Sequence, residues 1–169
     1  MWKTIIEKYL KITITMHLKS KISIFFLLFL TICGFILRIY HLGTPSFWLD
    51  EAISANAAVA LIKHGTPTFP SGFIYMRSIL NTLFIALSFM IFDVSEFSAR
   101  FPAVVFGTLT IPLVYMMGAR LGNRKIALIA ALFITFSVME IAWSRQARMY
   151  QQLQFFYLAS VYFFYEFNS

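Results

Sequence analysis

Hydrophobic residues in this chain fall into long blocks that short polar segments separate. The apolar blocks occupy residues 22–40, 79–92, 101–119, 126–143 and 153–167. A helix needs about 20 predominantly apolar residues to cross a bilayer, whereas a block of about 10–14 suits a helix at the membrane surface. The pattern therefore predicts spanning helices near residues 22–40, 101–119, 126–143 and 151–167, because the block at 79–92 is too short to cross.

The segment between the first two predicted spans, residues 41–100, mixes polar and apolar positions. Residues 43–46 form a turn signal of Gly, Thr, Pro and Ser. Apolar residues at helical spacing then predict a helix near residues 48–63, and Gly and Pro residues follow its end. A second helix is predicted near residues 75–92. We expect both helices to lie along the membrane surface outside the cell.

Positive charge predicts the orientation in the membrane. The first 21 residues carry five lysines, and residues 119–125 carry two arginines and a lysine without an acid. Such excess marks cytoplasmic segments, so the N-terminus is expected to be cytoplasmic. Residues 1–21 are predicted to form a basic, interfacial segment, with a frayed tail as the alternative. No small-residue cleavage site follows the first span, which predicts an uncleaved signal anchor.

Composition supports the membrane class. The chain is 60% hydrophobic and 12% charged, whereas soluble domains carry about 25% charged residues. The net charge of +7 comes from residues spread between apolar blocks rather than from one stripe, which excludes nucleic acid as the expected partner. We predict an all-α, multi-pass integral protein of the plasma membrane, in which residues 22–169 form one membrane domain.

Two adjacent carboxylates stand just outside the first predicted span. Asp50 and Glu51 are two of only seven acids in the chain, and an ionisable group at a membrane predicts a function. Neighbouring residues on a helix point about 100° apart, so one acid is expected to act on a ligand while a partner holds the other. The alternative is that both acids only stabilise the positive N-terminal end of a helix.

Three motifs follow one another in a recognisable order. They read Phe-Trp-Leu-Asp-Glu at residues 47–51, Ser-Ala-Arg-Phe-Pro at 98–102 and Ser-Arg-Gln-Ala-Arg-Met-Tyr at 144–150. Together they resemble the polyprenyl-phosphate-sugar-dependent glycosyltransferases of the GT-C superfamily, and most closely the dolichyl-phosphate-mannose–protein mannosyltransferase-like group. The resemblance covers about residues 22–167. It implies the N-terminal part of a GT-C membrane domain, with the remaining part of a split or truncated enzyme as a partner.

The resemblance also implies an activity. It predicts inverting transfer of a hexose from a polyprenyl-phosphate-linked donor to a hydroxyl group of a protein or glycan acceptor outside the cell. By resemblance Asp50 is the expected general base, with Glu51 second. A divalent metal at Asp50 is left open, and no other cofactor is expected. Tyr150, an auxiliary candidate, stands where many relatives carry a second Asp, which weakens the case for a two-carboxylate metal site.

Three arginines are candidates for binding the donor phosphate, namely Arg100, Arg145 and Arg148. Arg100 could instead pair with an active-site carboxylate, or with Glu96 one helical turn earlier. The other two arginines could instead reach lipid headgroups. Glu140 is a further auxiliary candidate, expected to face protein or water near Arg145 or Arg148, or to lie among the outer headgroups.

Two functions of other classes compete with the enzyme. One is a small non-catalytic membrane protein, or a remnant, that binds lipid or a partner subunit. The other is a transporter fragment, which would have helices broken by Gly or Pro in the middle of the membrane. Gly107 and Pro112 give that alternative only faint support.

Overall fold

The computed structural model describes the backbone of residues 2–168 and the side chains of residues 21–167. The helices are α1 (Trp2–Ile39), α2 (Leu49–His64), α3 (Ile79–Phe92), α4 (Glu96–Leu121), α5 (Arg124–Phe136), α6 (Val138–Ser144) and α7 (Tyr150–Asn168). Thr68 and Ile74 form an isolated bridge between extended residues. The predicted all-helical fold is confirmed for this part of the chain, in which no strand is present.

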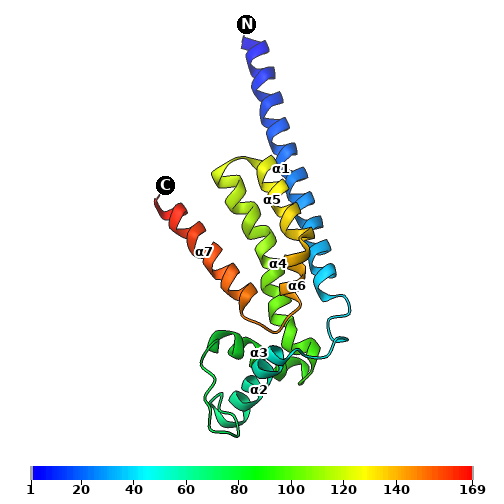
Figure 1. Cartoon of the computed structure of the whole chain (residues 1–169). Helices are drawn as coiled ribbons and strands as arrows, with labels where there is room; N and C mark the ends of the chain where they lie inside the picture. The colour runs from blue at the N-terminus through cyan, green and yellow to red at the C-terminus, as the bar shows by residue number, and fades with distance from the viewer. Residues whose placement is uncertain (1, 169) are drawn as a thin grey trace.

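The long helices form a bundle, and the short helices α2 and α3 pack against each other at one end of it (Figure 1). In the bundle α4 contacts α1, α5, α6 and α7. The N-terminal half of α1 and the turn between α4 and α5 point toward the opposite end (Figure 1). The predicted placing of residues 1–21 and 119–125 on one side of the membrane stays a prediction. The side chains of residues 1–20, which include most of the predicted interfacial segment, lie outside the described residues.

Fewer helices are long and apolar enough to cross a membrane than the four predicted. Within the described residues, Lys21–Ile39 of α1 and the whole of α4 meet that requirement. Helices α5 and α6 meet it only as a pair, bent by 58°. The stretch predicted as the fourth span lies in α7, whose first turns contain three glutamines that lower its hydropathy. The structure therefore supports two spans, or three with the bent pair.

The bend between α5 and α6 lies at Ser137, whose hydroxyl accepts an N–H group from the first turn of α6. The break leaves carbonyl groups at the end of α5 without intrahelical partners. Arg38 of α1 donates to two of them, the carbonyls of Ile134 (3.0 Å) and Thr135 (3.3 Å). Its Nε atom donates to the Ser144 hydroxyl in α6 (3.1 Å). Arg38 thus joins α1 to both sides of the break, a role that the sequence did not predict.

A glycine brings α4 close to the end of α6 and the start of α7. A Cβ atom at Gly107 would lie 2.1 Å from Oγ of Ser144 and 2.9 Å from Oε1 of Gln151. No side chain fits in that space, so the backbone of α4 itself contacts these residues. This contact fixes the segment between α6 and α7 against α4, and that segment lines a cavity together with the start of α2.

Candidate functional site

A cavity of about 260 Å³ lies between the N-terminus of α2 and the segment that joins α6 to α7. Its walls are formed by Trp48, Leu49, Asp50, Glu51, Trp143, Gln146, Arg148 and Tyr150. Four of the residues predicted for the site, two acids, an arginine and a tyrosine, therefore lie at one place. They come from two motifs almost 100 positions apart in the sequence, and folding brings them together.

Helix α2 begins at this cavity because Glu51 organises its first turn. The Glu51 carboxylate accepts the N–H of Trp48, the N-cap residue, at 3.1 Å. This bond is one of the two in a capping box. The other would need an acceptor on the side chain of the N-cap residue, and the indole ring of Trp48 has none. The first N–H groups of α2 therefore have no side-chain cap. They lie at the cavity, where the positive end of the helix favours an anion.

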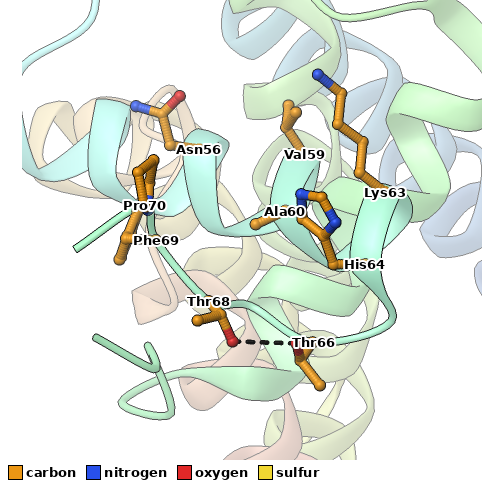
Figure 2. A pocket seen from close by; sticks show the side chains of 9 residues that line it. All are labelled: Asn56, Val59, Ala60, Lys63, His64, Thr66, Thr68, Phe69 and Pro70. Carbon is orange, nitrogen blue, oxygen red and sulfur yellow. Dashed lines mark hydrogen bonds between the residues drawn. The ribbon is translucent and has the colours of Figure 1, made fainter. Parts of the chain in front are cut away.

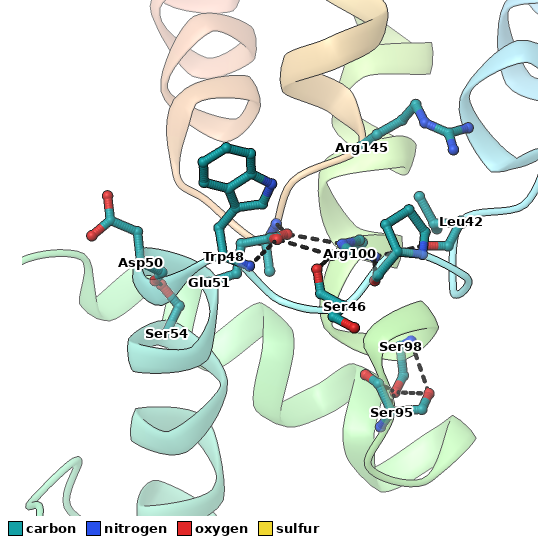
Figure 3. A network of polar contacts seen from close by, with 12 residues as sticks. Leu42, Ser46, Trp48, Asp50, Glu51, Ser54, Ser95, Ser98, Arg100 and Arg145 are labelled. Carbon is teal, nitrogen blue, oxygen red and sulfur yellow. Dashed lines mark hydrogen bonds and ion pairs between the residues drawn. The ribbon is translucent and has the colours of Figure 1, made fainter.

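Glu51 and Arg100 form a buried ion pair (Figure 3). Nε of Arg100 donates to Oε1 at 2.8 Å, and Nη2 donates to Oε2 at 2.9 Å. Glu51 is 1% exposed and Arg100 is 2% exposed. The other N–H groups of Arg100 donate to the carbonyls of Leu42, Pro45 and Ser46. All five N–H groups of the guanidinium are thus occupied, which favours the alternative in which Arg100 pairs with an active-site carboxylate. Binding of the donor phosphate by Arg100 stays a prediction, and in this geometry Arg100 has no free N–H group to donate to a phosphate.

Glu51 has a further partner in the segment between α6 and α7. Its Oε1 atom accepts the N–H of Ala147 at 2.8 Å. Burial alone would raise the pKa of Glu51, but hydrogen bonds from Arg100, Ala147 and Trp48 and the charge of Arg100 outweigh it, so the pKa is lowered. The carboxylate is ionised and surrounded by donors. Its geometry is that of a residue that positions α2, α4 and the connecting segment, and its predicted catalytic role stays untested.

Asp50 points away from Glu51 and into solvent (Figure 3). Its side chain is 66% exposed, whereas that of Arg148 beside it is 8% exposed. Nη2 of Arg148 lies 3.6 Å from Oδ2 of Asp50, and Nη1 donates to the backbone carbonyl of the same residue at 3.2 Å. The guanidinium also lies 5.8 Å from the centre of the Tyr150 ring. The cavity thus presents an accessible carboxylate beside an arginine that is held in place.

Two other predicted site residues lie outside the cavity. Arg145 points away from Asp50 (Figure 3) and donates to backbone carbonyls at the end of α1, those of Leu37, Arg38, Tyr40 and His41. Glu140 faces the protein, but its hydrogen-bond partners are the amides of Gln151 (3.4 Å) and Gln154 (3.0 Å) rather than Arg145 or Arg148. Phosphate binding by Arg145 and an auxiliary role for Glu140 stay predictions without support from these positions.

Four residues of the cavity were not among the predicted site residues, namely Trp48, Leu49, Trp143 and Gln146. The ring of Trp143 packs edge-on against Tyr150, with ring centres 4.5 Å apart. Trp143 ends an apolar block, which hid it among residues expected to face lipid. Its position directly before the Ser-Arg-Gln-Ala-Arg-Met-Tyr motif was the available signal.

A larger groove, of about 810 Å³, lies along α2 and the loop after it (Figure 2). It is lined by Asn56, Val59, Ala60, Lys63, His64, Thr66, Thr68, Phe69 and Pro70, without a carboxylate. Among the described side chains, no three His, Cys, Asp or Glu residues come together to hold a metal. Within that part of the chain, the open alternative of a metal at Asp50 therefore has no set of protein ligands. The smaller cavity is the place where a candidate base and a candidate anion site meet.

Comparisons with known proteins point to one family. A family model described as dolichyl-phosphate-mannose-protein mannosyltransferase matches residues 76–168, a range that includes Arg100, Arg148 and Tyr150. An uncharacterized protein of Aquifex aeolicus (strain VF5) is 31% identical over 137 residues, which cover 78% of this chain. The match covers 28% of that relative, so this chain spans only part of its length. No solved structure matches.

Proposed function

This chain belongs to the dolichyl-phosphate-mannose-protein mannosyltransferase family, and from that membership we propose that it forms the active-site end of a membrane-embedded glycosyltransferase. The donor is a polyprenyl-phosphate-linked hexose, and the acceptor is a hydroxyl group of a protein or glycan outside the cell. The chain spans 28% of the relative that it matches, so we attribute the complete activity to a protein that contains this region together with further membrane helices.

The observation that carries the proposal is the exposed carboxylate of Asp50 beside the buried Arg148. In the proposed step, the acceptor oxygen attacks C1 of the sugar while its proton passes to Asp50. The bond between C1 and the phosphate oxygen breaks, and the electron pair leaves with the polyprenyl phosphate. Arg148 and the N-terminus of α2 stabilise the negative charge that develops on that oxygen. Attack opposite to the leaving group inverts the configuration at C1.

Glu51 and Arg100 have a different role in this proposal. Their buried pair holds the first turn of α2 against α4, and the bond from Ala147 to Glu51 holds the connecting segment in register with both helices. This pair therefore holds the backbone of Asp50 near Arg148, although the two residues lie 98 positions apart in the chain. Such positioning is what brings a base and an anion site into one geometry before the substrate binds.

The membrane arrangement is part of the proposal. The N-terminus and residues 119–125 lie on the cytoplasmic side of the plasma membrane, and the cavity of Asp50 lies on the external side. α1, α4, the bent pair and α7 then act as four crossings. The bundle supports this arrangement, because α2 and α3 lie at one end while the turn between α4 and α5 lies at the other (Figure 1).

The test is replacement of Asp50 by Asn in the complete protein. Asn keeps the size of Asp but cannot take up the acceptor proton, so sugar transfer should fall by about 10²–10⁴-fold. Expression and membrane insertion should not change. The matched control is Asp93→Asn, which alters an exposed acid outside the cavity and should keep full activity. Wild-type turnover in the Asp50→Asn protein would contradict the proposed role of Asp50.

A further inference from the structure

The cavity of Asp50 has an aromatic wall that neither proton transfer nor phosphate binding uses. Trp48, Trp143 and Tyr150 are three of its eight lining residues. Trp48 is 75% exposed, which is unusual for so large an apolar ring. The ring of Trp143 packs edge-on against Tyr150, at an interplanar angle of 62°. The two tryptophans thus border the cavity from different elements, Trp48 from the start of α2 and Trp143 from α6.

A hexopyranose has the chemistry that such a wall recognises. Its hydroxyl groups lie mostly around the rim of the ring, while one face presents C–H bonds with a small positive charge. The face of an aromatic ring is negative, so it attracts these C–H bonds while excluding water from them. The volume of about 260 Å³ is below the range of about 300–1,000 Å³ that holds drug-sized ligands. The cavity therefore suits one sugar ring rather than an oligosaccharide.

Polar groups stand where the rim of such a sugar would lie. The side chain of Gln146 lines the cavity and makes no hydrogen bond within the described chain, so its amide is available to a hydroxyl group. Arg148 and the first turn of α2 lie at the same cavity, where they would meet the phosphate that carries the sugar. The cavity thus has an apolar wall, an amide and an anion site around one ring-sized space.

We propose that Trp48 and Trp143 bind the sugar of the donor through a C–H face that no axial hydroxyl obstructs, with Gln146 at its rim and Arg148 at its phosphate. This inference rests on the proposed function and adds the part of the donor that each side chain contacts. The competing explanation for the tryptophans is anchoring at the membrane interface, where Trp and Tyr are enriched. An anchor responds to the bilayer but not to a sugar.

The experiment measures binding to this chain in lipid nanodiscs by tryptophan fluorescence. The chain has three tryptophans, and a Trp2→Phe background leaves emission from Trp48 and Trp143 alone. The probes are farnesyl phosphate, farnesyl phosphate carrying mannose and farnesyl phosphate carrying glucose. The glycosylated probes should bind about 3–10-fold more tightly than farnesyl phosphate, because only they carry a sugar face that the aromatic rings can contact, and they should change the emission.

Two variants and a control make the test specific. Trp48→Leu should reduce the preference for the glycosylated probes without disturbing the fold, because Trp48 is mostly exposed. Trp143→Leu should also reduce the preference, and Trp143→Phe should retain most of it. Tyr40→Leu removes an exposed aromatic ring that lies outside the cavity and should change nothing.

The possible results separate this inference from the proposed function. Equal affinity of the wild-type chain for farnesyl phosphate and its glycosides would overturn the aromatic contact while leaving the phosphate site. A sugar preference that survives both Trp48→Leu and Trp143→Leu would also overturn it, since other residues would then bind the sugar. If none of the probes binds, the phosphate site of the proposed function fails together with the inference.

Discussion

Glu51 and Arg100 bind each other through two hydrogen bonds between charged groups, although 49 residues separate them in the chain. The pair lies out of contact with water, and every N–H of the guanidinium has an acceptor in the protein. Asp50, the residue directly before Glu51, is mostly exposed and pairs loosely with Arg148. The two adjacent acids therefore differ in environment, and this difference can be measured.

Replacing Glu51 by Gln should destabilise the chain strongly. The change leaves the charge of Arg100 buried without a counter-ion, and breaking a buried pair in this way costs about 3–5 kcal/mol. Asp50→Asn, the matched control, alters an exposed carboxylate and should change the free energy of unfolding by about 0.5 kcal/mol at most. Denaturant unfolding in detergent, followed by circular dichroism, measures both values. Small and equal effects would show that the two acids only stabilise the end of a helix.

The stability of the chain should depend on pH through Glu51. Its pKa is lowered in the folded state, so the unfolded chain takes up the proton first as the solution becomes acidic. The stabilisation is complete above the ordinary carboxyl pKa of about 4.3 and is lost as the pH falls through the lowered folded value. Denaturation midpoints measured between neutral and strongly acidic pH should fall more steeply for the wild type than for Glu51→Gln. Parallel curves would contradict the assignment.

Arg148 and Arg145 should respond differently to replacement by Lys. Arg148 lies in the cavity, so loss of its planar fork should weaken farnesyl phosphate binding by about tenfold, as expected when a hydrogen bond to a charged group is lost. Arg145 donates to carbonyls at the end of α1, so Arg145→Lys should leave binding unchanged and lower only the stability. The measurement is titration with the lipid phosphate in nanodiscs. Equal weakening by both changes would place the phosphate nearer the end of α1.

Gly107→Ala should separate α4 from α6. The added methyl group would lie 2.1 Å from Oγ of Ser144, and overpacking of this kind costs about 1–3 kcal/mol. Gly43→Ala is the comparison, because its nearest neighbour, Cβ of Phe97, would lie 3.2 Å away, and the loss should be smaller. Thermal unfolding of the two variants gives the comparison. If Gly107→Ala were as stable as the wild type, the close contact between these helices would not exist.

Much of the helical structure could be predicted because apolar spacing is a local property. The apolar block at residues 79–92 has the same bounds as α3, and the helix predicted near residues 48–63 corresponds to α2. The break at Ser137 could not be predicted, since the block at 126–143 stays apolar across it. Arg38, which binds the carbonyls at the break, lies on a distant helix, and no local pattern contains that contact.

Half of the residues that line the site could be predicted from the motifs, and their roles only in part. The motifs indicated Asp50, Glu51 and Arg148, which the structure brings to one cavity. The sequence left two partners open for Arg100, an active-site carboxylate and Glu96 one helical turn earlier, and Arg100 binds Glu51. A contact between distant segments overrides a helical pair that is worth only about 0.2–0.5 kcal/mol. Which acid is buried and which is free depends on those distant contacts.

The contact between Arg38 and α5 joins two parts of the chain that are synthesised at different times. Ile134, whose carbonyl it binds, follows 96 residues later, so at about 5–20 residues per second the ribosome supplies this acceptor about 5–20 s after Arg38. During that interval the charged side chain of Arg38, near the C-terminal end of the first span, has no α5 carbonyl to bind, and a side chain of this length can reach water. The bent pair α5 and α6 is synthesised after α1 and then packs against it. α5 and α6 inserted without α1 would therefore lack the group that binds their open carbonyls.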